Sequence, residues 1–252
     1  MPLLQKLPLI QHLYYRYLYP QNIKETKKLI LFYKNILNES DLVFDVGANI
    51  GKLTHVFALL CKQVVAIEPQ PSCIKALHAR FHKYSDLIKI CPYAISPEKN
   101  QTSFYIADQH TMSSMSQDFI HQVQNTWSFS PKWRKKITVK TTTLDALIEH
   151  YGYPQYIKID VEGYEEYVLK TLSKPIPWLS FEFTPTLHTQ ALRCIEMLEN
   201  VSTYRYNISL EENYRWYLPQ FVTAQEMQVI ITNQLSPIGK FGDLFAQLRH
   251  TS

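Results

Sequence analysis

The chain is poor in cysteine, has no long apolar run and carries no large excess of either charge. Its four cysteines among 252 residues form no Cys-x-x-Cys pair, so we interpret them as reduced core residues of a cytoplasmic protein. No apolar run approaches the roughly 20 residues of a membrane-spanning helix, and no signal-peptide pattern is visible. The formal net charge of +4 is too small to indicate nucleic-acid binding by itself.

The composition is that of an ordinary globular protein, with 46% hydrophobic and 19% charged residues. Its length suits one α/β domain with an appendage. Residues 1–40 are aromatic and basic, and apolar side chains have helical spacing over 9–18 and 24–38. We therefore expect an N-terminal helical appendage that caps the sheet of a domain over 41–252. An acceptor lid, a dimer contact and a membrane-surface helix are alternatives for this appendage.

A turn between a strand and a helix is the most informative stretch. The apolar run Leu42–Phe44 predicts a buried strand, and the apolar residues of 52–60 lie on one helical face. Gly47 and Gly51 lie between the two elements, where glycine permits turn conformations and a close backbone approach. Such a turn directs backbone N–H groups and the positive end of a helix dipole at a ligand.

Two acidic residues extend this turn into a predicted nucleoside pocket. Asp45 ends the first strand, and Glu68-Pro69 ends the next apolar run, Val64–Ile67. Glu68 follows Gly47 by about 20 residues, the spacing at which an acid reaches ribose hydroxyls. A dinucleotide fingerprint would need a second glycine where Asn49 stands, which disfavours a nicotinamide-dependent oxidoreductase. Asp45 suits a ligand with a cationic amine, and the turn with Glu68 resembles motif I and the acidic loop of class I S-adenosylmethionine-dependent methyltransferases.

A second stretch gives a more specific resemblance. It is a buried strand that ends in acids before a helix begins, Lys158-Ile159-Asp160-Val161-Glu162-Gly163-x-Glu165. Together with Thr143-Leu144-Asp145 and Ala94-Ile95-Ser96, it resembles the signature of the FkbM-type methyltransferase family. The resemblance extends from about 41 to 183. It implies a Rossmann-like α/β fold with a mostly parallel seven-stranded sheet flanked by helices, S-adenosylmethionine as donor, and O-methylation of sugar or natural-product hydroxyls.

The region 101–143 interrupts the alternation of strands and helices. Strands are predicted over 102–106 and 137–141, with a long polar stretch between them. We interpret it as an inserted hairpin or lid that shapes an acceptor site, with a partly ordered surface insertion as the alternative. The basic run 132–140 is interpreted as a solvated face, with a phosphate or nucleic-acid contact as the alternative. The runs 204–208 and 244–248 predict an antiparallel pair that closes the sheet.

The resemblance assigns roles to individual residues. In the donor pocket, Asp45 would bind the amine, Glu68 and Pro69 would face the ribose, and Ala94 and Ser96 would border the adenine. The backbone cradle and the strand end beside the donor would comprise Gly47, Ala48, Asn49, Gly51 and Asp160.

An alcohol acceptor benefits from a general base near the transferred methyl group. Asp160 and Glu162 are the first choices for this base, and Glu182 and His188 are the second. A structural alternative for Glu162 and Glu165 is helix capping and loop fixing. We expect no metal, although Asp160, Glu162 and Glu182 offer oxygen ligands for Mg²⁺ if they converge.

The sequence thus predicts an enzyme that methylates a hydroxyl of a small-molecule, glycan or peptide natural product, without a nucleic-acid partner. Carboxylate methylation, which needs no base, is the nearest alternative. RNA methylation lacks a visible recognition module. A non-catalytic binding module on the same fold is the alternative from another class, and Asp45, Glu68 and Asp160 argue against it.

Overall fold

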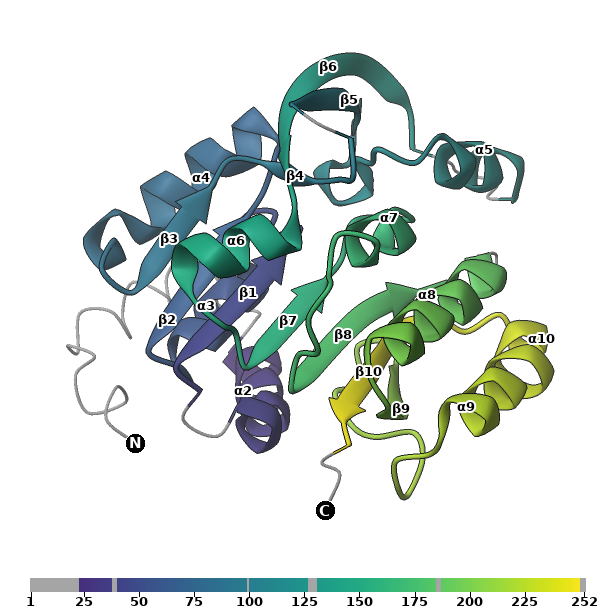
Figure 1. Ribbon diagram of the computed structural model, residues 1–252. Coiled ribbons are helices and arrows are strands. Elements are labelled where there is room, and N and C mark those ends of the chain that lie inside the picture. Colours follow the sequence, from purple (N-terminus) through teal and green to yellow (C-terminus); the bar gives the residue numbers. More distant parts are fainter. Residues whose placement is uncertain (1–22, 38–39, 99, 127–130, 185–186, 250–252) are drawn as a thin grey trace.

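A seven-stranded sheet forms the centre of the computed structural model, which describes residues 23–37, 40–98, 100–126, 131–184 and 187–249 (Figure 1). The strand order is β3-β2-β1-β7-β8-β10-β9. All strands run in one direction except β10, which is antiparallel to both of its neighbours. In sequence order, the strands are β1 (Leu42–Val46), β2 (Gln63–Ile67), β3 (Ile88–Cys91), β7 (Tyr156–Ile159), β8 (Trp178–Phe183), β9 (Tyr204–Leu210) and β10 (Gly242–Leu248). The predicted Rossmann-like fold and the predicted antiparallel closing pair are both confirmed.

Helices cover both faces of this sheet, because each strand presents apolar side chains alternately to the two sides. One face packs against α2 (Ile23–Leu37), α3 (Lys52–Ala58) and α4 (Pro71–Phe81). The other packs against α6 (Leu144–Tyr151), α7 (Glu165–Leu169), α8 (His188–Val201) and α9 (Ala224–Ile230). Three short helical segments complete these layers, η1 (His82–Tyr84), the π-helix η4 (Ile231–Leu235) and α10 (Ser236–Ile238).

The helix α2 is an integral part of one of the two large hydrophobic cores. Its buried side chains include Leu29, Phe32 and Tyr33, which pack with Phe57 of α3 and Phe245 of β10. This helix matches the expectation for 24–38 and covers one face of the sheet. The helix expected over 9–18 lies outside the described residues. No described helix is long and apolar enough to span a membrane.

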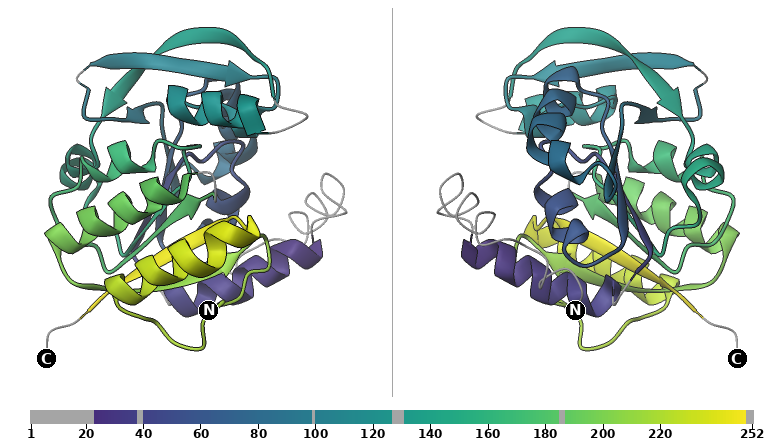
Figure 2. Two further views of the ribbon diagram at one scale, coloured as in Figure 1. Left: turned by 90° about the vertical axis from the view of Figure 1, so that its right-hand side faces the viewer. Right: turned by 90° about the vertical axis from the view of Figure 1, so that its left-hand side faces the viewer.

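The inserted region forms a small layer of its own beyond the carboxyl ends of the parallel strands (Figures 1 and 2). Here β5 (Gln101–Ala107) pairs with β6 (Trp133–Thr142), and β6 also pairs with β4 (Ala94–Ile95). Between the hairpin strands lie η2 (His110–Met112) and α5 (Gln117–Thr126). The apolar face of α5 contacts Trp133, which gives the insertion its own core. The sequence pattern predicts both hairpin strands but not α5.

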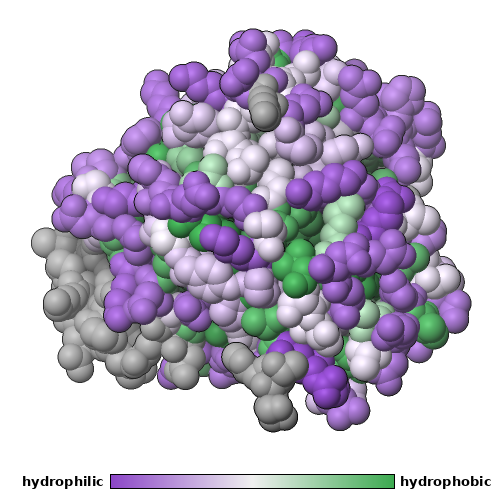
Figure 3. Space-filling model, in the orientation of Figure 1, coloured by the Kyte–Doolittle hydropathy of each residue, from purple (hydrophilic) through white to green (hydrophobic). Residues whose placement is uncertain are grey.

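The surface on the face drawn in Figure 3 is hydrophilic over most of its periphery. Apolar residues are exposed nearer its centre.

Candidate active site

A cavity of about 360 Å³ lies at the carboxyl ends of the parallel strands. The turn after β1, the loops after β2 and β3, and the acidic ends of β7 and β8 line it, together with the beginning of β10. This is the edge of an open α/β sheet at which ligands bind, because loops diverge there. The two motifs that stand apart in the sequence thus share one cavity.

The glycine turn after β1 fits closely against the end of β7. Gly47 has a φ of 83°, and its N–H group donates to the Ile67 carbonyl over 2.9 Å. Asn49 follows with a φ of 51°. Gly51, with a φ of 84°, faces the other way, and a Cβ there would approach the Phe81 ring to 2.5 Å. Gly47 and Asn49 therefore shape the cavity, whereas Gly51 permits α3 to pack against α4.

Glu68 is fixed in place by two backbone donors. Its Oε2 accepts the Asn49 N–H over 2.8 Å, and its Oε1 accepts the Gln70 N–H over 2.7 Å. Its side chain is buried yet lines the cavity. Burial raises the pKa of this carboxyl to about 7, although the two backbone bonds act in the opposite direction. Each oxygen retains a further lone pair, so the carboxylate suits a ligand with two adjacent hydroxyls.

Asp45 lies at the inner end of the same cavity. Thr54 of α3 donates its hydroxyl to Asp45 Oδ2 over 2.5 Å, a partner that the sequence analysis does not predict. Burial raises the pKa of Asp45 to about 6, while Thr54 and the charge of Lys158 lower it. A cationic group of a ligand would favour the ionised form of this carboxyl.

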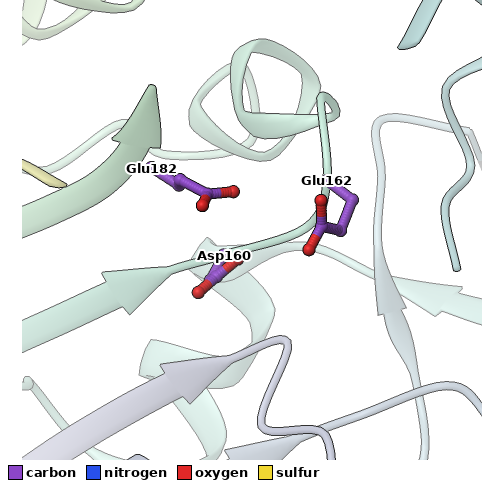
Figure 4. Close-up of side chains that lie close together, drawn as sticks. All are labelled: Asp160, Glu162 and Glu182. Atoms are coloured by element: carbon purple, nitrogen blue, oxygen red, sulfur yellow. The ribbon is translucent and has the colours of Figure 1, made fainter. Parts of the chain in front are cut away.

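Three carboxylates converge at the carboxyl ends of β7 and β8 (Figure 4). Asp160, Glu162 and Glu182 each offer an oxygen, and these oxygens lie within 4.8 Å of one another. Glu162 has a left-handed backbone with a φ of 52°. Burial, and then the charge of Asp160, raise the pKa values of Glu162 and Glu182 well above their usual range. The spacing also permits a divalent cation with oxygen ligands.

A buried lysine lies behind this group. Lys158 is only 1% exposed. Its ammonium group donates to Asp243 Oδ1 over 2.8 Å and to Asp160 Oδ2 over 3.3 Å. Burial alone would lower the pKa of Lys158, but the charges of the two aspartates hold it well above its usual value. Asp243 is a cavity residue that the sequence analysis misses, and its only sequence signal is an acid just before an apolar strand.

A second lysine also lines the cavity. Lys52, at the start of α3, pairs with Glu25 of α2 over 2.6 Å and with Glu212 over 3.1 Å. Tyr214 donates its hydroxyl to Glu25 over 3.1 Å. Among the lining residues that the structure describes, Lys52 and Lys158 are the only lysines or arginines, and both are paired with acids.

Most residues that the sequence assigns to the site line this cavity. They are Asp45, Gly47, Ala48, Asn49, Glu68, Pro69, Ala94, Asp160, Glu162 and Glu182. Gly51, Ser96 and His188 are not among its lining residues. The Ser96 hydroxyl is buried, lies 3.2 Å from the Tyr164 hydroxyl and accepts the Glu98 N–H, so internal partners occupy it. His188 is the first residue of α8.

Glu165 has the structural role considered for it from the sequence. Its Oε1 accepts the N–H groups of Val161 and Gly163, over 3.1 Å and 3.3 Å. These bonds fix the loop that carries Glu162. The side chain of Glu165 is itself buried and does not line the cavity.

Comparison with known proteins identifies similar sequences. The chain matches the profile of the Methyltransferase FkbM domain over residues 45–217. It is 29% identical to the hexuronic acid methyltransferase AglP of Haloferax volcanii over 148 residues, which are 57% of this chain and 54% of AglP. It is also 37% identical to a probable ribosomal RNA small subunit methyltransferase A of Methanosarcina barkeri over 62 residues, which cover 25% of this chain and 22% of that protein. The chain thus spans about half of AglP and less of the second relative.

Among solved structures, an FkbM methyltransferase from Methylobacillus flagellatus is similar to this chain. The two are 14% identical with a TM-score of 0.46, over 83% of this chain and 44% of that one.

Proposed function

The chain belongs to the FkbM methyltransferase family, and on that premise we propose that it transfers a methyl group from S-adenosylmethionine to a hydroxyl of a sugar or similar natural product. The observation that carries the proposal is the convergence of Asp45, Glu68 and Asp160 in one cavity. These three residues come from neighbouring strand ends and offer acids for the amine, the ribose and the reacting end of the donor.

The contacts of the described residues support this donor site. Glu68, held by two backbone donors, would accept both ribose hydroxyls. Asp45, oriented by Thr54, would face the amine. The absence of a side chain at Gly47 leaves the turn close to Asp160, so the methionine part of the donor would lie against the backbone there. Tyr93 and Ala94, after β3, would border the adenine.

The acceptor end of the cavity favours a neutral hydroxyl over a carboxylate. Eight acidic side chains of the described residues line the cavity as a whole. Both lysines of this described lining are paired with acids, so neither is left to bind an anionic acceptor. A carboxylate brought to Asp160 would meet a like charge in a partly buried site, which opposes its binding. We therefore rank carboxylate methylation below hydroxyl methylation.

The chemistry required of the protein is modest. The bound donor supplies an activated methyl group, which the acceptor oxygen takes as the carbon–sulfur bond breaks. The chain must position the acceptor hydroxyl and accept its proton. Glu162 and Glu182 suit the proton acceptor, because burial and the charge of Asp160 raise their proton affinity. His188 is a weaker candidate because it does not line the cavity.

Calorimetric titration with S-adenosylmethionine tests the donor site. Wild-type protein should bind in the micromolar range, Glu68→Ala should lose at least tenfold in affinity, and Glu149→Ala, at an exposed acid on α6, should bind like wild type. Equal affinity in Glu68→Ala and wild type would refute the assignment. A panel of neutral sugars and polyols then tests transfer. Donor binding without transfer to any acceptor would favour the non-catalytic alternative.

A further inference from the structure

We propose that Lys158 and Asp243 form a buried ion pair that positions Asp160 at the reacting end of the cavity, which makes both of them positioning residues for methyl transfer. This inference rests on the proposed function. Asp243 lies outside residues 45–217, which match the family profile. The family match therefore does not reach Asp243, whereas Lys158 and Asp160 lie in the matched region.

The strand register explains why these groups meet. Lys158 is the Cα partner of Asp45 on β1 and of Ser180 on β8, so their side chains share one face of the sheet. On the next pair of strands, Asp243 stands opposite Glu182. Polar side chains on this face therefore extend from β1 to β8, where the β10 partner of Ser180 is the apolar Phe245, and Glu182 and Asp243 lie two residues further along, toward the edge where the cavity opens.

The direction of β10 brings Asp243 to this edge. A parallel strand would present its last residues here, but β10 is antiparallel and presents its first residues. Gly242 precedes Asp243, and a Cβ at that position would lie 2.4 Å from the Ser209 carbonyl oxygen. The close approach of β9 therefore requires glycine there and fixes the start of β10 beside the site.

The burial of the three groups indicates what each does. The side chain of Lys158 is 1% exposed, that of Asp243 is 25% exposed and that of Asp160 is 37% exposed. The lysine thus lies beneath the cavity, and its closest bond is to Asp243. Its longer bond holds one oxygen of Asp160, while much of the Asp160 side chain remains accessible to a ligand. Lys158 also donates to the Ile159 carbonyl, so its three N–H groups are engaged.

A buried ammonium group is tolerated only with such partners, because removal of one partner leaves an uncompensated charge. An ammonium held by two carboxylates is protonated and is unsuited to act as the base. Its contribution is to fix the direction of Asp160 and to separate the negative charges of Asp45, Asp160 and Asp243. Loss of the ion pair between Lys158 and Asp243 would let Asp160 move, and small displacements of reacting groups reduce turnover strongly.

The test compares Asp243→Asn with Asp86→Asn, an exposed aspartate of the loop before β3. We expect Asp243→Asn to bind S-adenosylmethionine within about threefold of wild type and to leave the acceptor KM similar, but to lower kcat by about tenfold or more. Lys158→Met should lower kcat further, and Lys158→Arg should restore part of it. The double variant Lys158→Met/Asp243→Asn should resemble Lys158→Met alone, because the two residues act through one contact.

Wild-type kcat in folded Asp243→Asn would overturn the proposal, and so would additive effects in the double variant. Thermal unfolding of the wild type, Asp243→Asn, Lys158→Met and the double variant measures the coupling of Lys158 to Asp243 without any turnover. An absence of coupling would also overturn the ion pair. A failure of the proposed function would give a different result from a failure of this inference. If the proposed function fails, the wild-type chain itself would methylate no acceptor, while the coupling measured by thermal unfolding would still decide whether the ion pair forms.

Discussion

A Cβ atom on Gly47 would lie 1.8 Å from the backbone carbonyl oxygen of Asp160. The turn after β1 and the acidic end of β7 are therefore in direct contact, although more than a hundred residues separate them in the chain. This contact places the predicted donor residues beside the predicted reacting residues, and it leaves no space for any other amino acid at position 47.

Gly47→Ala should consequently destabilise the protein and abolish donor binding. The substitution combines a φ of 83° with a clash against backbone, so we expect a loss of more than about 2 kcal/mol in the free energy of unfolding. Gly239→Ala is the matched control, because Gly239 has a φ of 67° but nothing within 4 Å of its added Cβ. The Gly239→Ala variant should lose only about 1 kcal/mol in the free energy of unfolding. Denaturant unfolding of both variants measures the difference, and equal losses would contradict the contact.

Donor affinity should fall as the pH decreases below about 7. Burial raises the pKa of Glu68 to about 7 in the donor-free protein, and the ionised form is the one that accepts two ribose hydroxyls. Affinity should therefore fall by up to about tenfold for each pH unit below that value. Titrations between pH 5 and 7 check this. Glu68→Gln should show a weaker and flatter dependence, and a flat wild-type profile would argue against Glu68 as the ribose acceptor.

The stability of the donor-free protein should change with pH in the opposite direction to donor affinity. Between the ordinary carboxyl pKa of 4.5 and about 7, Glu68 binds a proton in the folded state but not in the unfolded state. Its contribution to the free energy of unfolding therefore decreases as the pH rises through this window, by an amount on the order of 3 kcal/mol. Saturating donor should offset the decrease. Urea unfolding at pH 5 and pH 7.5 measures it, with Glu68→Gln expected to be less sensitive to pH.

Neutral acceptors should be preferred to anionic ones. A neutral sugar should have a KM at least about tenfold lower than its matching uronic acid, because the like charge of Asp160 repels the latter. Asp160→Asn should narrow this preference, since it removes that charge from the cavity. Competition assays with the paired sugars provide the measurement. A preference for the uronic acid would instead favour carboxylate recognition, and the ranking of acceptors would have to be reversed.

Chelation should leave methyl transfer intact. Although Asp160, Glu162 and Glu182 have oxygens within 4.8 Å of one another, Lys158 already donates to Asp160, and both glutamates have raised proton affinity. A divalent cation would have to displace protons from these carboxyls. Assays with and without a chelator, followed by addition of Mg²⁺, check this. Loss of activity that Mg²⁺ restores would assign the cluster to a metal.

The sequence predicts the donor half of the site better than the acceptor half. Asp45, Glu68 and Asp160 each end a parallel strand, and the carboxyl ends of parallel strands meet at one edge, so local patterns suffice to place them together. Asp243 reaches the same edge from an antiparallel strand, and only the register between β8 and β10 reveals this. No local sequence pattern predicts that register.

Side-chain direction sets a second limit on prediction. Ser96 lies beyond β3 as expected, but its hydroxyl lies beside Tyr164 instead of the cavity. Thr54 lies in the first turn of α3 and donates its hydroxyl to Asp45, which depends on how α3 packs against β1. The helix α5 escapes prediction because its apolar side chains are few and serve only the small core with Trp133.

The order of the strands separates two tasks within one sheet. Groups suited to the donor come from β1, β2 and the loop after β3, whereas the acids of the acceptor end come from β7, β8 and β10. Under the proposed assignment, changes in β8 or β10 should therefore alter acceptor preference while Asp45 and Glu68, and with them the donor affinity, remain unchanged.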